Sequence, residues 1–242
     1  MRIPRIHLDR ALAPGQAIEL DRATANYLLK VLRLRPGSPL TVFNGQGGEF
    51  AATLTEQRPA RIEIGEFHDR ETESPLAITL VQGVSKGDRM DTAIQKAVEL
   101  GVTRIVPVMT ERSVVNLKGE RKEKRTRRWQ TIAASACEQC GRNRLPTIDA
   151  PRTLADWLGA EPPAGATRVV LDPTADAGFT DLERPAHACL LIGPEGGLTD
   201  EEITAAADTG YRRIGLGPRV LRTETAAITA ISLAQGLWGD LG

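Results

Sequence analysis

Three apolar runs in the second half of the chain each lead into a proline-containing turn, and this punctuation restricts the fold more than any other feature. The turns are Asp172-Pro173, Gly193-Pro194 and Gly217-Pro218. Proline has no backbone N–H to donate to a neighbouring strand, so each predicted strand should end at its turn. If the strands are parallel, the three turns lie at one edge of the sheet, where open α/β sheets bind ligands.

Strand and helix patterns alternate before these turns. Residues 77–83 and 104–109 are predicted strands, and a helix capped by Asp88 should run to Leu100 and end at Gly101. A second helix is predicted over residues 123–139, with an apolar stripe made of Trp129, Ile132, Ala133, Ala136, Cys137 and Cys140. Such alternation is typical of an α/β fold with a parallel sheet.

The first 70 or so residues have a different pattern, with short alternating strands and an Asn/Gly-rich hairpin over residues 39–54. Residues 21–34 predict one helix with an apolar stripe of Tyr27, Leu28, Val31 and Leu32. The polar segment 68–75 ends in a proline and is the candidate linker. We therefore expect a small β-rich domain at residues 1–72 and an α/β domain at residues 73–242.

The composition is that of an ordinary globular protein, with 41% hydrophobic residues and a formal net charge of zero. The three cysteines are an odd number, which favours reduced thiols and a cytoplasmic location. The N-terminus has no apolar stretch typical of a secretory signal. No run approaches the roughly 20 apolar residues that span a bilayer, so we expect no membrane association.

The neutral total hides a basic block between residues 112 and 128. Its only acidic residues are Glu120 and Glu123, and its basic residues are Arg112, Lys118, Arg121, Lys122, Lys124, Arg125, Arg127 and Arg128. A run of charged residues is often only the solvated face of a helix. Here, however, positive charge dominates and Arg142 and Arg144 follow in the sequence, which favours contact with phosphate. Nothing in the block resembles a motif for sequence-specific readout.

The second turn opens a glycine-rich loop, Gly193 to Gly197, before a helix start. Thr199 and Glu202 fit a capping box, and the glycines permit close approach of a ligand to the backbone. A plain tight turn between strand and helix would have the same residues. The dinucleotide fingerprint is absent from the loop and the phosphate-loop motif is absent from the chain, which weighs against a nucleotide-binding enzyme of those classes.

The third turn precedes a long apolar helix. Arg219, Arg222 and Glu224 lie at its start, where charged groups are costly unless they are paired or functional. The alternatives are a surface ion pair between Arg222 and Glu224 or a helix cap at Thr223. Cys137 and Cys140 form a C-x-x-C on the apolar stripe, which favours core packing over zinc or redox chemistry, and we expect no metal.

Three long motifs are specific when they are taken together: L-I-G-P-E-G-G-L-T-D-E-E, L-G-P-R-V-L-R-T-E-T-A-A and K-G-D-R-M-D-T-A-I-Q-K-A-V-E-L-G-V-T-R-I-V-P. They resemble the bacterial 16S rRNA (uracil-N3)-methyltransferase family of the SPOUT class. The segment N-Y-L-L-K-V-L-R-L-R-P-G is similar to the small PUA-like domain of that family. This domain departs from the family pattern at Asn26, Ser38 and Asn44, where the family often has His, Asp and Asp.

The resemblance implies a SPOUT-type parallel sheet with a C-terminal deep trefoil knot, a homodimer, and S-adenosylmethionine as cofactor. The implied cofactor-binding residues are Leu171, Ile192, Gly193, Pro194, Glu195, Gly196, Gly197, Leu216, Gly217, Leu221, Arg222, Thr223, Thr225 and Ala226. The expected partner is the 16S rRNA of the 30S subunit. The predicted RNA-binding residues are Arg33, Arg112, Arg121, Lys122, Lys124, Arg125, Arg127, Arg128 and Arg142.

The implied reaction needs a residue to accept the uracil N3 proton and a cation to stabilise charge on the carbonyl oxygens. We assign these catalytic roles to Glu224 and Arg222, and we regard Glu195 as a pocket residue. Three alternatives stay open: a SPOUT methyltransferase acting on another RNA or base atom, a non-catalytic RNA-binding or ribosome-assembly module, and an α/β enzyme that binds a nucleotide without methyl transfer.

Overall fold

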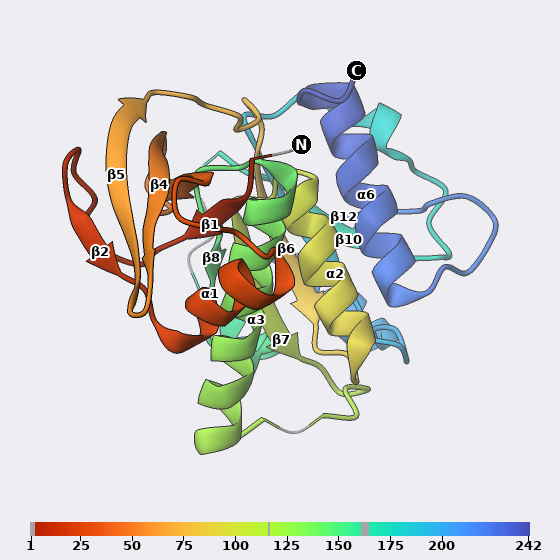
Figure 1. Ribbon diagram of the computed structural model, residues 1–242. Coiled ribbons are helices and arrows are strands. Elements are labelled where there is room, and N and C mark those ends of the chain that lie inside the picture. Colours follow the sequence, from red (N-terminus) through yellow and green to blue (C-terminus); the bar gives the residue numbers. More distant parts are fainter. Residues whose placement is uncertain (1–2, 116, 161–164) are drawn as a thin grey trace. The chain divides into compact units, whose positions relative to one another are not determined.

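The computed structural model describes residues 3–115, 117–160 and 165–242 (Figure 1). The chain divides into two compact units. The first comprises residues up to Glu73 together with Cys137–Leu145, and the second comprises Ser74–Ala136 and Pro146–Gly242. The boundary near residue 73 lies within the linker candidate, whereas the sequence did not assign Cys137–Leu145 to the first unit.

The first unit is built on a five-stranded sheet with the order β1-β3-β4-β5-β2. The predicted hairpin forms between β3 and β4, and β5 continues the antiparallel pairing. The first strand pairs with β3 in parallel, and β2 pairs with β5 in antiparallel orientation. The strands are β1 (Arg5–His7), β2 (Ala17–Glu19), β3 (Pro39–Phe43), β4 (Glu49–Gln57) and β5 (Ala60–His68).

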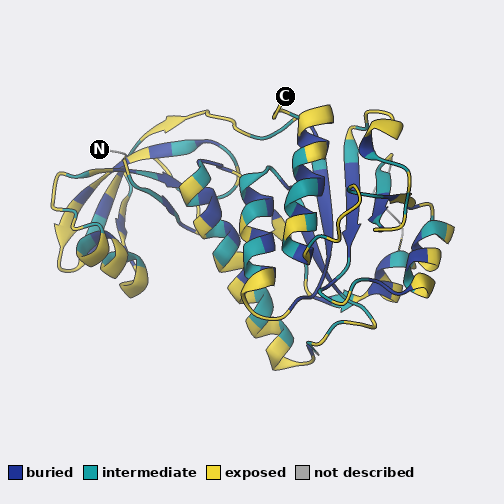
Figure 2. Cartoon of the chain, turned by 90° about the vertical axis from the view of Figure 1, so that its right-hand side faces the viewer, coloured by how far each residue is buried: buried dark blue, intermediate teal, exposed yellow. Residues whose placement is uncertain are grey.

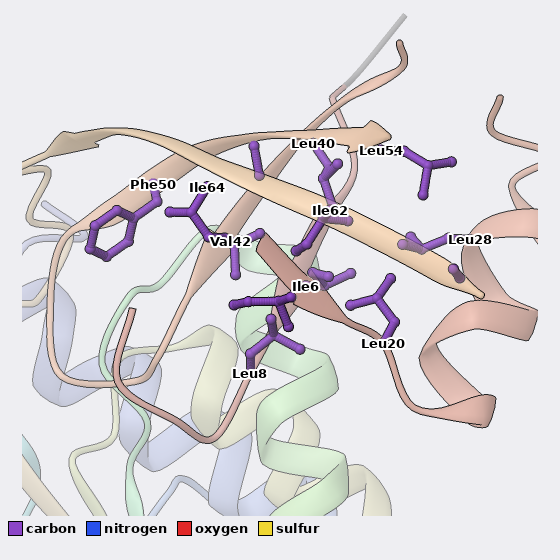
Figure 3. Close-up of a cluster of buried hydrophobic side chains, with 13 residues drawn as sticks. Ile6, Leu8, Leu20, Leu28, Leu40, Val42, Phe50, Leu54, Ile62 and Ile64 are labelled. Carbon is purple, nitrogen blue, oxygen red and sulfur yellow. The ribbon is translucent and has the colours of Figure 1, made fainter. Parts of the chain in front are cut away.

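Alternate side chains of these strands fill a core that is aliphatic except for Phe50 (Figure 3). Ile6, Val42, Leu54 and Ile62 are each at most 1% exposed. Period-two alternation places such side chains on one face of a sheet, and their burial stabilises the unit by about 1.5–3 kcal/mol for each large residue. Leu28, from the helical segment after β2, joins the same cluster.

That helical segment differs from the prediction of one regular helix over residues 21–34. Asp21 caps a short helix α1 (Arg22–Asn26), which passes into a π-helical turn η1 (Tyr27–Val31). Of the predicted apolar stripe, Leu28 is buried, but Tyr27 and Val31 are 42% and 67% exposed. The wider π turn changes the angular spacing of side chains, so a stripe derived from a 3.6-residue period does not hold here.

The second unit contains a seven-stranded sheet in which β12-β10-β11-β6-β7-β8 are neighbours and β9 also pairs with β7. Every pairing in it is parallel, as predicted. Most side chains of its central strands are buried (Figure 2). The strands are β6 (Ala77–Gly83), β7 (Arg104–Met109), β8 (Thr147–Ile148), β9 (Arg152–Thr153), β10 (Thr167–Leu171), β11 (His187–Ile192) and β12 (Arg212–Ile214).

Helices accompany this sheet, and α2 and α6 lie side by side (Figure 1). The stripe predicted for α3 is confirmed at Trp129, Ala133, Ala136 and Cys137, which are at most 1% exposed. The predicted cap at Asp88 is wrong, because Gly87 is the N-cap residue and Asp88 lies in the first turn. The helical elements are α2 (Asp88–Glu99), α3 (Glu120–Cys140), α4 (Leu154–Leu158), η2 (Phe179–Asp181), α5 (Asp200–Asp208) and α6 (Thr223–Trp238).

The proline turns begin where two of the three strands end. Strands β10 and β11 stop at Leu171 and Ile192, immediately before Asp172-Pro173 and Gly193-Pro194. The third strand, β12, ends earlier than predicted, at Ile214. The next N–H, that of Gly215, donates to Ala177 O at 2.8 Å, so the chain leaves the sheet two residues before Gly217-Pro218.

Candidate cofactor pocket and basic groove

The loops after β10, β11 and β12 surround a cavity of about 360 Å³ at the carboxyl edge of the parallel sheet. This volume is within the usual range for small-molecule sites. The expectation that the three loops share one edge is therefore confirmed. The predicted cofactor-binding residues that line the cavity are Leu171, Ile192, Gly193, Pro194, Glu195, Gly196, Gly197, Leu216, Gly217, Leu221, Thr223 and Ala226.

The glycine loop, residues 193–198, forms one wall of this pocket. The N–H of Gly197 donates to Pro194 O at 2.9 Å, and Gly197 has φ +71°, a conformation that favours glycine. A Cβ at Gly193 would lie 2.8 Å from the Leu198 nitrogen, so this position also needs a glycine. The predicted capping box of Thr199 and Glu202 is present and starts α5 directly after the loop.

Glu195 ties the glycine loop to the segment that follows β6. Its Oε1 accepts hydrogen bonds from the Lys86 backbone N–H at 2.8 Å and from Arg89 Nη1 at 3.1 Å. Burial raises the pKa of this carboxyl group, but the hydrogen bonds and the Arg89 charge outweigh burial and lower the pKa overall. Glu195 therefore acts in the structure as an ionised anchor of the loop.

Arg112 ties the opposite side of the same loop, although the sequence suggested an RNA contact for it. Its Nη1 donates to Gly196 O at 3.1 Å and to Leu198 O at 3.2 Å. A Cβ at Gly196 would lie 2.9 Å from the Arg112 Cβ, so the two residues are closely packed. Arg112 lines the pocket, and its tight contact explains the need for glycine at position 196.

A third contact joins the glycine loop to the start of α6. The Thr223 hydroxyl donates to Gly193 O at 2.6 Å and accepts from Gln82 Nε2 at 2.9 Å. Both Thr223 and Gln82 are buried. Because Arg222 occupies the N-cap position of α6, the alternative of a cap at Thr223 does not apply. Thr223 instead connects two of the loops that line the pocket.

Three predicted residues, Arg222, Glu224 and Thr225, are not among the residues that line the cavity. Arg222 is exposed, and Glu224 is half-buried with its Oε2 enclosed and without a hydrogen-bond partner among the described residues. In the described part of the chain these two side chains form no ion pair with each other, so the surface-pair alternative is not supported. They flank Thr223 at the edge of the pocket.

Asp172 is a pocket residue that the sequence analysis missed. It is 2% exposed, accepts hydrogen bonds from the N–H and hydroxyl of Thr174, and pairs with Arg213 Nε at 2.6 Å. Burial raises the pKa of Asp172, but these partners lower it overall. The Asp-Pro dipeptide was the available signal. Other lining residues not predicted for the cofactor are Pro173, Thr174, Leu198, Asp200, Ile203, Ile214, Arg219 and Val220.

A second concavity, the basic groove, has a volume of about 1120 Å³. Its walls combine cationic side chains with an apolar part made of Val114, Val115 and Leu117. The cationic residues are Lys86, Arg121, Lys124, Arg125, Arg127 and Arg128. Five of them were predicted to bind RNA, while Lys86 was missed because it lies far from the basic block in the sequence.

The remaining predicted RNA-binding residues lie elsewhere. Lys122 is half-buried on α3 outside the groove lining, and Arg33 is exposed in the first unit with φ 56°. Arg142 is 4% exposed and its Nε donates to Glu73 at 2.9 Å. A guanidinium buried in an ion pair is unavailable to phosphate, so Arg142 is removed from the set of proposed contacts.

Comparison with known proteins agrees with this architecture. A family model described as an RNA methyltransferase domain matches residues 72–235, and one described as an RNA methyltransferase PUA domain matches residues 20–64. A relative from Buchnera aphidicola, called ribosomal RNA small subunit methyltransferase E, is 37% identical and covers 99% of this chain and 98% of its own. The chain belongs to this methyltransferase family.

Solved structures of similar proteins support the same membership. The ribosomal RNA small subunit methyltransferase E of Neisseria gonorrhoeae, bound to S-adenosyl methionine, is 40% identical, with a TM-score of 0.91 and full coverage of both chains. A Legionella pneumophila protein in complex with the same cofactor is 39% identical, with a TM-score of 0.94 and full coverage. The fold is thus a SPOUT-like α/β domain preceded by a PUA-like domain.

No described helix is long and apolar enough to cross a membrane. Within the described ranges, His, Cys, Asp and Glu side chains do not gather in groups of three that could hold a metal ion.

Proposed function

We propose that this protein transfers a methyl group from S-adenosylmethionine to N3 of a uridine in the 16S rRNA of the small ribosomal subunit. The observation that carries the proposal is the glycine loop, which walls the pocket and is bonded to Lys86, a residue that also lines the basic groove. A small-molecule pocket and a polyanion-binding groove are the two sites that such a reaction needs. Whole-length relatives named ribosomal RNA small subunit methyltransferase E add weight to the proposal.

The pocket suits the cofactor. The glycines at 193 and 196 leave backbone groups open to a ligand, while Leu171, Ile192 and Leu216 provide apolar surface for a base. Glu195 and Asp172 place negative charge near a cationic ligand. When bound, S-adenosylmethionine supplies an electrophilic methyl group on a sulfonium centre.

The protein must then make N3 of uracil nucleophilic. This nitrogen carries a proton and its lone pair is delocalised, so the proton must leave before or during attack. Glu224 has an enclosed carboxylate oxygen with no partner among the described residues, and we assign it to accept or orient that proton. Arg222 is exposed beside the pocket, and we assign it to stabilise the charge that develops on O2 or O4.

The basic groove is the proposed RNA contact. Its cations suit backbone phosphates, and its valines and leucine can contact a base or sugar. The target base must be unpaired or flipped, because N3 lies on the Watson–Crick edge and is hidden in a duplex. A ribosomal substrate places the reaction in the cytoplasm.

We also propose the homodimer and the knot that the resemblance implies. Leu233 and Leu237, four residues apart on α6, are 40% and 44% exposed, and Val220 in the adjoining loop is 84% exposed. A second copy covering these side chains would remove an apolar surface from water. Sedimentation analysis should therefore give a dimer, and Leu233→Asp with Leu237→Asp should give a monomer. The contacts of Gly215 with Ala177 and of Thr223 with Gly193 support the knotted crossing of residues 215–222.

The deciding experiment is radiolabelled methyl transfer to 30S subunits that lack the modification and to naked 16S rRNA, followed by nucleoside analysis. Label in N3-methyluridine supports the proposal, and label in another nucleoside favours a methyltransferase of different specificity. If the protein binds RNA but neither binds the cofactor nor transfers label, the non-catalytic assembly module is the better description. Calorimetry with S-adenosylmethionine separates the two methyltransferase readings, which require cofactor binding, from the non-catalytic module and from an enzyme that uses another nucleotide, which do not.

A further inference from the structure

The glycine loop is held by two segments that continue into the basic groove. One is the turn after β7, residues 110–113, and the other is the segment between β6 and α2, which contains Lys86. The pocket and the groove are therefore not independent sites. They share the glycine loop and its two supports.

The turn at 110–113 is closed by its own hydrogen bonds and is also bonded to the glycine loop and α5. Thr110 N–H donates to the Ser113 hydroxyl at 3.1 Å, and Ser113 N–H donates to Thr110 O at 3.1 Å. Between them, Glu111 N–H donates to Glu202 at 2.8 Å, and Arg112 donates to Gly196 and Leu198. The chain then enters the groove lining at Val114 and Val115.

The segment between β6 and α2 also joins the glycine loop to the basic groove. The Lys86 backbone N–H donates to Glu195, while Lys86 also lines the groove. Arg89, the second residue of α2, donates its own hydrogen bond to Glu195. A phosphate that attracts the Lys86 ammonium would thus act on a residue whose backbone anchors the glycine loop.

We propose that Arg112 is a positioning residue of the cofactor pocket and that, through it, RNA in the basic groove tightens cofactor binding. This inference rests on the proposed function. An RNA that contacts Val114 and Val115 in the groove favours the arrangement in which Arg112 holds Gly196 and Leu198, and this arrangement shapes the pocket wall. The coupling is reciprocal, so bound cofactor strengthens RNA binding by the same factor.

The test measures affinity of the full-length protein for S-adenosylhomocysteine, which cannot donate a methyl group, with and without a saturating naked 16S rRNA transcript. In the wild type we expect RNA to tighten binding at least about fivefold, the lower end of typical coupling between sites. Arg112→Ala should weaken cofactor binding and reduce the RNA effect to less than about twofold. Arg112→Lys, which keeps one cationic donor, should restore part of both.

Salt dependence separates positioning from direct phosphate contact. Loss of a residue that neutralises a phosphate lowers the slope of log affinity against log salt by about one. We expect this change for Arg121→Ala but not for Arg112→Ala. The matched control is Arg184→Ala, since Arg184 is an exposed arginine of the same unit outside both lining sets.

The outcomes are distinguishable from failure of the proposed function. If the wild type does not bind S-adenosylhomocysteine at all, the proposed function fails. If both ligands bind but RNA leaves cofactor affinity unchanged, only the coupling is overturned. If Arg112→Ala lowers the salt slope by about one and keeps the coupling, Arg112 is a phosphate contact and its positioning role is wrong.

Discussion

The two loops that approach the pocket from β11 and β12 differ in how firmly the protein holds them. The glycine loop, residues 193–198, is bonded by Lys86 and Arg89 through Glu195, by Arg112 through two carbonyls, and by Thr223 through Gly193. In the open loop, residues 216–222, the described contacts are sparse, and Val220 is 84% exposed.

This difference suggests that the two loops have different functions. A loop fixed by side chains from several elements offers a preformed surface at little entropic cost, which suits a small cofactor. A loop with few bonds can adapt to, or be completed by, a larger partner. The open loop leads into Arg222 and Glu224, so the proposed chemical groups lie beside the adaptable loop, whereas both loops contribute lining residues to the cofactor cavity.

The largest effect should come from the proposed chemical groups. Arg222→Ala and Glu224→Gln should each lower turnover about 10²- to 10³-fold, because each removes charge stabilisation or proton transfer at the reacting base. Cofactor affinity, measured by calorimetry in parallel, should change little, since neither side chain lines the cavity. If both variants keep near-normal methyl transfer, the catalytic assignment is wrong.

A matched pair of glycine substitutions compares the two loops directly. In Gly193→Ala the new Cβ would meet backbone atoms at 2.8 and 2.9 Å, so the fixed loop must shift. If typical overpacking costs of about 1–3 kcal/mol fall on the cofactor-bound loop, cofactor binding should weaken about 5- to 150-fold. In Gly217→Ala the Cβ would meet nothing within 4 Å, and only the strain at φ +80° remains.

Both glycine variants should be measured for cofactor affinity and for melting temperature. We expect Gly193→Ala to lose much more affinity than Gly217→Ala. Equal losses would mean that the open loop is as closely fitted to the cofactor as the glycine loop, and the contrast between the loops would disappear.

The features that were predictable from the sequence are those encoded within a few residues. Proline turns, the parallel α/β alternation, the capping box at Thr199 and the stripe of α3 all follow from local spacing. The π-helical turn at Tyr27–Val31 was not predictable, because no residue type marks a change from 3.6 to wider spacing.

Contacts between residues distant in the chain could not be predicted from the sequence. Arg112 belongs to a basic block and was grouped with the RNA contacts, yet it faces two carbonyls more than 80 positions away in the chain. Arg142 was grouped in the same way and is buried against Glu73. Charge sign can be read from a sequence, but the partner of a charge is set by tertiary structure.

Thr223 joins the start of α6 to the glycine loop through its hydroxyl group, and removal of this hydroxyl tests whether α6 helps to hold the loop. Thr223→Val keeps the shape but removes the hydroxyl, leaving Gly193 O and Gln82 Nε2 short of one partner. Gln82 Nε2 still reaches Gly83 O at 3.3 Å and Gly193 O at 3.4 Å, so the free energy of unfolding should fall by about 1–3 kcal/mol, the usual net contribution of the two hydrogen bonds that are lost. Denaturant titration would measure this fall, and Thr223→Ser should restore most of the stability. Equal stability of Thr223→Val and wild type would show that the bridge is not important.

The smallest effect is expected at Glu195. Glu195→Gln keeps an oxygen that can accept from Lys86 N–H and loses only the charge interaction with Arg89, a partly exposed pair. Such pairs contribute up to about 1 kcal/mol, so cofactor affinity should fall no more than about fivefold. If the variant instead lost all turnover while it bound the cofactor normally, Glu195 would be a catalytic residue, and the assignment of that role to Glu224 in preference to Glu195 would be wrong.

The pH dependence of the same variant checks that Glu195 acts as an ionised anchor. Its pKa in the folded protein is lowered from 4.5, because the hydrogen bonds and Arg89 outweigh the opposing effect of burial. A lowered pKa means that the anchor's contribution is fully present above pH 4.5 and is lost as the pH falls through the folded value. The difference in stability between wild type and Glu195→Gln should therefore be constant from about pH 6 to 8 and shrink only below about pH 4.5. If the stability difference between wild type and Glu195→Gln vanished near pH 6, the Glu195 carboxyl group would be protonated at that pH. The glycine loop would then be held without the charge of Glu195.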